Sequence, residues 1–159
     1  MTEPHLLYRI EGNIAILTIN RPEVKNIFSP EMLTLWRQFV EEAKADHNVR
    51  VIIVTGKGDT FCSGGDIREM AEGRLRSWDM KKFLWEGVHR VIFALEDLDK
   101  PIIAAINGAA MGAGLDMAIM CDLRVCSDRA KLSESYILMG LVPGDGGAFF
   151  LQRLIGIGK

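Results

Sequence analysis

The sequence predicts an α/β protein, and three features of the chain lead to this prediction. Apolar, β-branched runs at residues 50–55 and 102–106 have the composition of buried strands. Glycine-rich turns at 61–67 and 107–116 follow these runs. Helical patterns, in which apolar residues recur every three or four positions, come after the turns. Because strands alternate with helices along the chain, the architecture is expected to be α/β.

Each element follows from a local signal. Two strands, 6–9 and 13–19, are joined at Gly12 in a hairpin-like start. Ser29 as N-cap and Pro30 at the first helical position begin an amphipathic helix over 30–46. The later elements are a strand at 50–55, a short helix near 66–72, the longest helical pattern at 77–98, a strand at 102–106, a helix at 113–120, strands at 122–126 and 131–133, and an apolar helix at 148–155. The apolar stripe of 77–98 is predicted to pack against the core, and residues near 70–90 are expected to shape the pocket.

Composition excludes several classes of protein. The 159 residues fit one domain, and a hydrophobic content of 48% is enough for a core. The net charge of −2, with mixed signs, indicates neither a nucleic-acid groove nor an anionic membrane surface as partner. The apolar runs are shorter than the ~18 residues of a membrane span.

Cysteine and histidine positions favour a reduced, metal-free protein. Cys62, Cys121 and Cys126 are odd in number and lack Cys-x-x-Cys spacing, so we expect free thiols in a cytoplasmic protein. The N-terminal residues have the pattern of neither a signal nor a transit peptide. The three histidines lie far apart in the sequence, and a metal site is not expected.

The last predicted helix, 148–155, carries apolar side chains that need a covering surface. Phe149, Phe150 and Leu154 are among them, and no further element follows before Lys159. We expect that a C-terminal segment absent from this chain, or a partner chain, covers this helix.

The two glycine-rich turns predict an anion site built from backbone. Glycine permits tight turns and the close approach of other groups, and a helix start leaves amide N–H groups without helical partners. Two such starts facing one cavity would offer two N–H donors to a single oxygen, which is an oxyanion hole. Gly112-Ala113-Gly114 also begins a dinucleotide fingerprint, but Met117 stands where its third small residue belongs, so we reject NAD binding.

Four ordered blocks of sequence make the chain similar to a known family. They are Lys25-Asn26, Phe61 to Ile67, Lys100 to Asp122, and Gly140 to Gly147. With these blocks, the chain resembles the crotonase superfamily, also called the enoyl-CoA hydratase/isomerase family, from Ile14 onward. The resemblance implies a crotonase-like spiral of ββα units, with residues 1–159 as the N-terminal core domain. It also implies assembly as trimers or dimers of trimers, through C-terminal helices that this chain lacks.

The resemblance further implies an acyl-CoA substrate, with coenzyme A as part of the thioester and no other cofactor. The backbone N–H groups of Gly65 and Ala113 would bind the thioester oxygen, and Lys25 would contact the CoA phosphates. The segment expected to contact the adenine or pantetheine part comprises Cys62, Ser63, Gly64, Gly65, Asp66 and Ile67.

Family hydratases use two carboxylates to move a proton and add water, and this sequence departs from that pattern. Asp116 stands at the first position in place of the usual Glu, with a shorter reach. Tyr136 stands at the second, and a phenol of pKa about 10 donates a hydrogen bond rather than acting as a base. Asp145 is the candidate second acid, ahead of Glu134 and Glu69. The structural alternatives are a solvated first-turn acid for Asp116, an N-cap for Asp145 and core filling for Tyr136.

The expected function is hydration of an enoyl-CoA through an enolate that the two N–H donors stabilise. Isomerisation, hydrolysis and decarboxylation of an acyl-CoA pass through the same enolate and stay open as alternatives. A CoA-thioester-binding protein without activity is the alternative of a different class, and Tyr136 at the second acid position motivates it.

Overall fold

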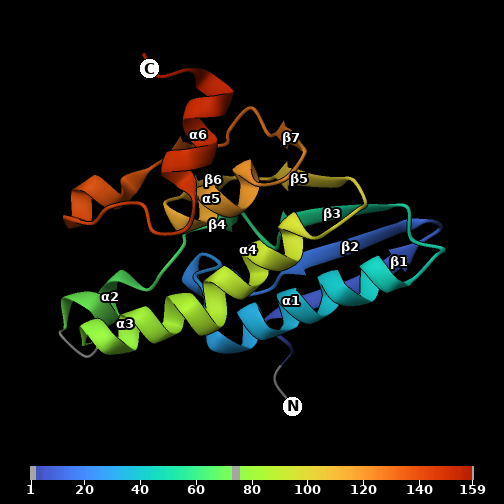
Figure 1. The fold of residues 1–159 in the computed structure, drawn as a ribbon, viewed down its shortest axis with the longest axis horizontal. Helices are drawn as coiled ribbons and strands as arrows, with labels where there is room; N and C mark the ends of the chain where they lie inside the picture. The colour runs from blue at the N-terminus through green and yellow to red at the C-terminus, as the bar shows by residue number, and fades with distance from the viewer. Residues whose placement is uncertain (1–2, 73–75, 159) are drawn as a thin grey trace.

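The computed structural model describes residues 3–72 and 76–158, and this part of the chain forms two sheets (Figure 1). The strands of the larger sheet, in the order β1-β2-β3-β5-β7, are β1 (Leu6–Glu11), β2 (Ile14–Ile19), β3 (Val51–Gly56), β5 (Ile102–Ile106) and β7 (Leu123–Cys126). In this sheet β1 is antiparallel to β2, and the other neighbours are parallel. The smaller, parallel sheet consists of β4 (Thr60–Cys62), β6 (Ala109–Met111) and β8 (Leu132–Ser133).

Helices connect these strands. They are α1 (Pro30–Ala45), α2 (Ile67–Ala71), α3 (Ser77–Phe83), α4 (His89–Glu96), α5 (Ala113–Ile119) and α6 (Gly147–Ile155). A π-helical turn at Leu84–Val88 joins α3 to α4, so the helix predicted over 77–98 exists but changes its winding in the middle. Short 3-10 helices lie at Pro22–Val24 and Ser135–Met139. Within the described ranges, every helix falls short of the length and apolar character that a bilayer span requires.

A ββα unit repeats from β3 onward. The pair β3 and β4 precedes α2 to α4, the pair β5 and β6 precedes α5, and the pair β7 and β8 precedes α6. In each unit the first strand joins the larger sheet and the second joins the smaller one. The predicted α/β spiral is thereby confirmed. The strands β4 and β6 were not predicted, because they lie inside the glycine-rich turns and three residues are too few to show an alternating pattern.

Much of the core lies between the larger sheet and the helices α1 and α4, which run along one face of it (Figure 1), and the core continues through α5, β4 and β6. Ser29 caps α1 as predicted, since its Oγ accepts a hydrogen bond from the Met32 amide at 3.1 Å. Trp36 of α1 is fully buried, as are Ile52 and Val54 of β3. Burial alternates along β3, whereas the sequence predicted a strand covered on both faces. Successive side chains of a strand point to opposite faces, and here the second face is only partly covered.

Glycines let the two turns touch through their main chains. A Cβ atom on Gly108 would lie 1.9 Å from the Asp59 carbonyl oxygen, and one on Gly114 would lie 2.2 Å from the Cys62 carbonyl oxygen. Both distances are too short for any side chain. The first turn and the second are therefore packed backbone against backbone, with β4 and β6 paired between them.

Gly114→Ala is expected to lower the free energy of unfolding by about 2 kcal/mol, because the new methyl group forces α5 away from β4. Urea denaturation of the variant and the unmodified protein measures this difference. Gly158→Ala is the control, since a Cβ there meets no atom within 4 Å. Equal stability of the two variants would show that the two turns do not depend on this contact.

Candidate active site

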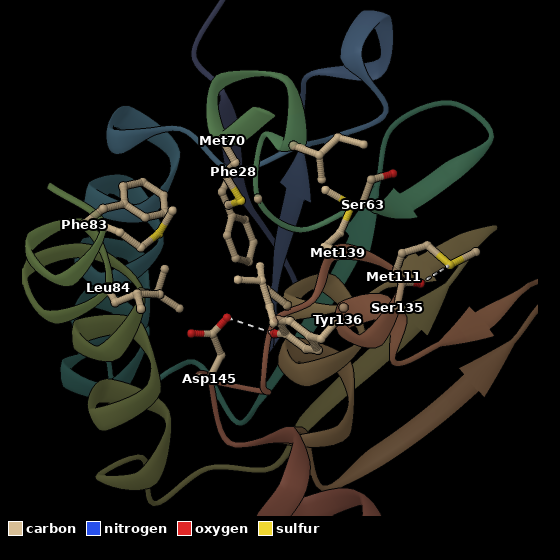
Figure 2. Close-up of a pocket in the computed structure, with 18 of the residues that line it drawn as sticks. Phe28, Ser63, Met70, Phe83, Leu84, Met111, Ser135, Tyr136, Met139 and Asp145 are labelled. Carbon is tan, nitrogen blue, oxygen red and sulfur yellow. Dashed lines mark hydrogen bonds between the residues drawn. The ribbon is translucent and has the colours of Figure 1, made fainter. Parts of the chain in front are cut away.

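An apolar pocket lies where the two glycine-rich turns, the α3–α4 helix and the segment after β8 meet (Figure 2). Its volume is about 820 Å³, open mouth included. Phe28, Phe83 and Leu84 line it, together with four methionines, Met70, Met80, Met111 and Met139. Methionine is flexible and polarisable, so such a wall adapts to an apolar guest of variable shape.

Gly65 of the first turn and Ala113 at the start of α5 both line this pocket. The turns are close to each other there, since a Cβ on Gly64 would lie 3.1 Å from the Ala113 nitrogen. Among the described residues, neither the Gly65 amide nor the Ala113 amide has a hydrogen-bond acceptor. Gly65 is partly buried, and Ala113 begins α5, where amide N–H groups lack helical partners.

Acidic side chains and a tyrosine gather on one side of the pocket. The Tyr136 hydroxyl lies 2.5 Å from Asp116 Oδ2 and 3.0 Å from Asp145 Oδ2. Asp116, on α5, is fully buried, and Asp145, in the loop before α6, is 4% exposed. Figure 2 shows Asp145 and Tyr136 pointing toward each other at the pocket wall. The structure thus brings together three residues that the sequence selected separately.

Burial sets the protonation of this cluster. Removal from water raises the pKa of Asp116 to about 7 and that of Asp145 to about 6, although the Tyr136 hydroxyl opposes both shifts. Desolvation also raises the pKa of Glu134, and the pKa of Tyr136 rises well above its usual range for the same reason. A carboxyl group that titrates near neutral pH can both give and take a proton, which suits general acid–base chemistry.

Asp145 and Tyr136 line the pocket, whereas Asp116 is fully buried and is not a lining residue. Asp116 is therefore no solvated first-turn acid, and its contact with the pocket runs through the Tyr136 hydroxyl. Glu134, a weaker candidate, has its carboxyl group beside that of Asp116. Glu69, the other weaker candidate, is exposed on α2 and is not a lining residue.

Part of the segment predicted to contact CoA lies at the pocket. Ser63, Gly65 and Ile67 line the pocket, and Gly64 turns the chain beside them with a φ of +77°. The positive φ requires glycine there, because other residues rarely adopt it.

Other predicted CoA ligands have side chains engaged elsewhere. The Cys62 thiol is buried, donates to the Asn26 carbonyl oxygen at 3.1 Å, and has its pKa raised by burial to about 12. The Asp66 carboxylate accepts a hydrogen bond from the Arg68 amide and caps α2. Lys25 Nζ lies 3.0 Å from both carboxylate oxygens of Asp59 and does not line the pocket.

The sequence predicted that residues near 70–90 shape the pocket but assigned the stripe that contains Met80, Leu84 and Val88 to packing, and the structure places these three at the pocket. Periodicity identifies an apolar stripe but cannot distinguish a core contact from a pocket wall. Sequence reasoning did not select His89, whose Nε2 lies 3.0 Å from the carbonyl oxygen of Gly144, the residue before Asp145.

Comparisons with known proteins bear on this site. The family model described as "Enoyl-CoA hydratase/isomerase" matches residues 9–159. A short-chain-enoyl-CoA hydratase of Clostridium acetobutylicum is 38% identical over 149 residues, which are 93% of this chain and 56% of that protein. A trans-2-decenoyl-[acyl-carrier-protein] isomerase of Streptococcus mutans is 33% identical over 96% of this chain and 58% of its own length.

A solved structure is similar over the same region. The crystal structure of an enoyl-CoA hydratase from Bacillus anthracis superposes with a TM-score of 0.89 at 29% identity, covering 97% of this chain and 59% of that one. The chain thus spans less than three fifths of the length of each of these proteins.

The free energy of unfolding of Asp116→Asn, measured relative to that of the unmodified protein, is expected to rise by roughly 2 kcal/mol between pH 5 and pH 8. The folded-state pKa of about 7 exceeds the ordinary value of 3.8. Between these values the folded protein holds a proton that the unfolded chain has lost, so its stability falls with rising pH, and the amide removes this fall. Urea denaturation at the two pH values measures the difference. Asp128→Asn, at an exposed position, is the control, and a pH-independent difference for Asp116→Asn would contradict the prediction.

Proposed function

The chain belongs to the enoyl-CoA hydratase/isomerase family, and we propose that it binds an acyl-CoA thioester and hydrates its double bond. The observation that carries the proposal is the pair of unpaired amides, Gly65 and Ala113, on an apolar pocket. Such a pocket suits an acyl chain, and the amides suit its thioester oxygen. The hydratase name of the Clostridium acetobutylicum relative supports the same reaction.

The amides would act on the charge that develops during the reaction. Attack on an α,β-unsaturated thioester, or loss of its α-proton, moves negative charge onto the thioester oxygen. Two fixed N–H donors stabilise that enolate more than they stabilise the neutral thioester, which is the condition for catalysis. Removing one donor from a comparable site costs about 3–4 kcal/mol of transition-state stabilisation.

The acids would move the proton. Asp145, whose carboxyl group lies at the pocket wall, is placed to exchange a proton with the substrate or with the attacking water. The Tyr136 hydroxyl joins it to Asp116, so that the two carboxyl groups act as one acid–base unit. In this proposal Asp145 takes the place of the second acid, and Tyr136 donates a hydrogen bond.

Coenzyme A would be the common part of the substrates. Ser63, Gly65 and Ile67 line the pocket along the first turn and are available for its pantetheine part. Lys25 is held by Asp59 in an exposed ion pair, which contributes little to stability. A CoA phosphate can therefore replace Asp59 as its partner.

We also infer a cytoplasmic protein that assembles as a trimer or a dimer of trimers. The free thiols of Cys62 and Cys121 fit a reducing compartment. Apolar side chains of α6 are about half exposed, as shown by Phe149 and Leu154, and they are available to an interface. Sedimentation of the purified protein measures its stoichiometry.

Isomerisation of an enoyl-CoA is the second candidate, and the placement of the two aspartates favours it. Asp145 lines the pocket, while Asp116 is buried outside the pocket lining and contacts the Tyr136 hydroxyl. A single carboxyl group in contact with the substrate suits the transfer of a proton from one carbon to another without addition of water. The isomerase of Streptococcus mutans carries that activity in its name.

Replacement of Ala113 tests the backbone donors directly. Ala113→Pro removes the N–H group at the first residue of α5, a position where helices accept proline. We expect kcat/KM to fall by about 10²–10³, with helix content unchanged by circular dichroism. Ala113→Gly keeps the N–H group and is the matched control, with kcat/KM within a few-fold of the unmodified protein. Equal activity of the two variants would exclude the Ala113 amide as a donor to the substrate.

A panel of 2-enoyl-CoA and 3-enoyl-CoA substrates tests the reaction itself. Mass spectrometry of the products separates hydration, which adds one water, from isomerisation, which leaves the mass unchanged. Asp145→Asn is expected to lower kcat by about 10²–10⁴, because the amide cannot accept the proton. Absence of turnover on the whole panel would refute the proposed function, and tight binding without turnover would favour a CoA-thioester-binding protein.

A further inference from the structure

The Tyr136 hydroxyl has two carboxyl neighbours but only one proton. Its oxygen lies 2.5 Å from Asp116 Oδ2 and 3.0 Å from Asp145 Oδ2. It can donate to one of these oxygens and accept from the other. Both contacts are hydrogen bonds only when one of the two aspartates carries a proton. The three groups therefore form a chain along which a proton can pass.

A fourth group extends this chain on the far side of Asp116. Asp116 Oδ1 and both Glu134 carboxyl oxygens are buried without a well-formed hydrogen bond in the part of the chain that the structure describes, and the Gly147 amide lies close enough to lower the pKa of Asp116. Asp116 Oδ1 and Glu134 Oε1 lie 2.1 Å and 3.0 Å from the point that a Cβ on Gly147 would occupy. Gly147 thus leaves room for the two carboxyl groups to meet, and a shared proton turns their contact into a hydrogen bond.

The two ends of this hydrogen-bonded series, Asp145 and Glu134, lie at different cavities of the protein. Asp145 lines the apolar pocket, whereas Glu134 lines a second groove, along α6, with Leu151 and Ile155. Asp116 lies fully buried between them. A route of proton carriers thus connects the apolar pocket with a groove outside it.

We propose that Tyr136 and Asp116 relay a proton between Asp145 in the pocket and Glu134 at the second groove. The relay rests on the proposed function, in which an acyl chain fills the pocket and keeps bulk water away from Asp145. The groove then gives the abstracted proton a separate path to solvent. Glu134 does not line the pocket, so in this proposal it accepts the relayed proton and does not contact the substrate.

The transfer balances without any outside reagent. In α-proton exchange, and in the reverse of hydration, Asp145 removes the α-proton, the C–H electron pair moves onto the thioester as the enolate, and an O–H bond forms on Asp145. Asp145 passes this proton to the Tyr136 oxygen while Tyr136 gives its own proton to Asp116 Oδ2. Asp116, which at the start holds on Oδ1 the proton that it shares with Glu134, passes that proton to Glu134. Glu134 then releases it to water when its carboxyl group, buried in this structure, turns into the groove. Burial raises the pKa of Tyr136, which disfavours a phenolate and makes the two tyrosine transfers concerted.

Deuterium exchange tests the relay. Octanoyl-CoA in D₂O gives the rate of α-proton exchange with solvent, and 2-octenoyl-CoA gives the rate of turnover. The ratio of the exchange rate to the turnover rate is insensitive to a general loss of activity. Tyr136→Phe interrupts the chain in the middle, and Glu134→Gln interrupts it at the groove. Each is expected to lower the ratio of exchange to turnover at least tenfold. Glu96→Gln, the same chemical change at an exposed position of α4, is expected to leave it unchanged.

Each outcome decides the proposal. An unchanged ratio in both variants overturns the relay, as does turnover without exchange in the unmodified protein, and a fall in only one of the two variants overturns the continuous route from Asp145 to Glu134. If the unmodified protein neither exchanges nor turns over these substrates, the proposed function fails instead. The relay is then judged without substrate, by infrared spectroscopy at neutral pH. It requires a protonated-carboxyl band that Glu134→Gln shifts or abolishes and Glu96→Gln does not, and the absence of such a band overturns it.

Discussion

The contact between two glycine-rich turns is the constraint on which the site depends. The backbone of Gly108 fits against Asp59, and that of Gly114 fits against Cys62, with no space for a side chain. This contact pairs β4 with β6 and brings Gly65 and Ala113 to the same pocket. Backbone amides held in this way have little freedom to reorient, which is what a preorganised anion site requires.

Burial of acids is the second physical theme. Asp116 and Asp145 are both removed from water, and ionising two neighbouring buried carboxyl groups is unfavourable. The Tyr136 hydroxyl contacts both aspartates, and the pKa of Asp116, raised to about 7, lets that group keep its proton close to neutral pH. Of these two acids, whose burial is unfavourable, Asp145 lines the pocket and Asp116 contacts the Tyr136 hydroxyl beside it.

The long helical region links the core to the pocket. Val91 and Leu95 of α4 pack in the core, whereas Met80 of α3 and Leu84 of the π-helical turn face the pocket. One apolar stripe therefore lines the pocket at its start and packs in the core at its end, and the transition lies near the π-helical turn. Such turns often occur at functional sites in helices.

The sequence by itself determined the α/β class, the cap of α1 at Ser29 and the two turns, because these follow from local patterns and from the conformational freedom of glycine. It also selected Asp116, Tyr136 and Asp145 as candidates. Only the tertiary structure decided that one hydroxyl joins the two aspartates, that Glu134 completes the cluster, and that the Lys25 ammonium group is held by Asp59. These are contacts between segments distant in sequence, and local patterns carry no information about which segments meet.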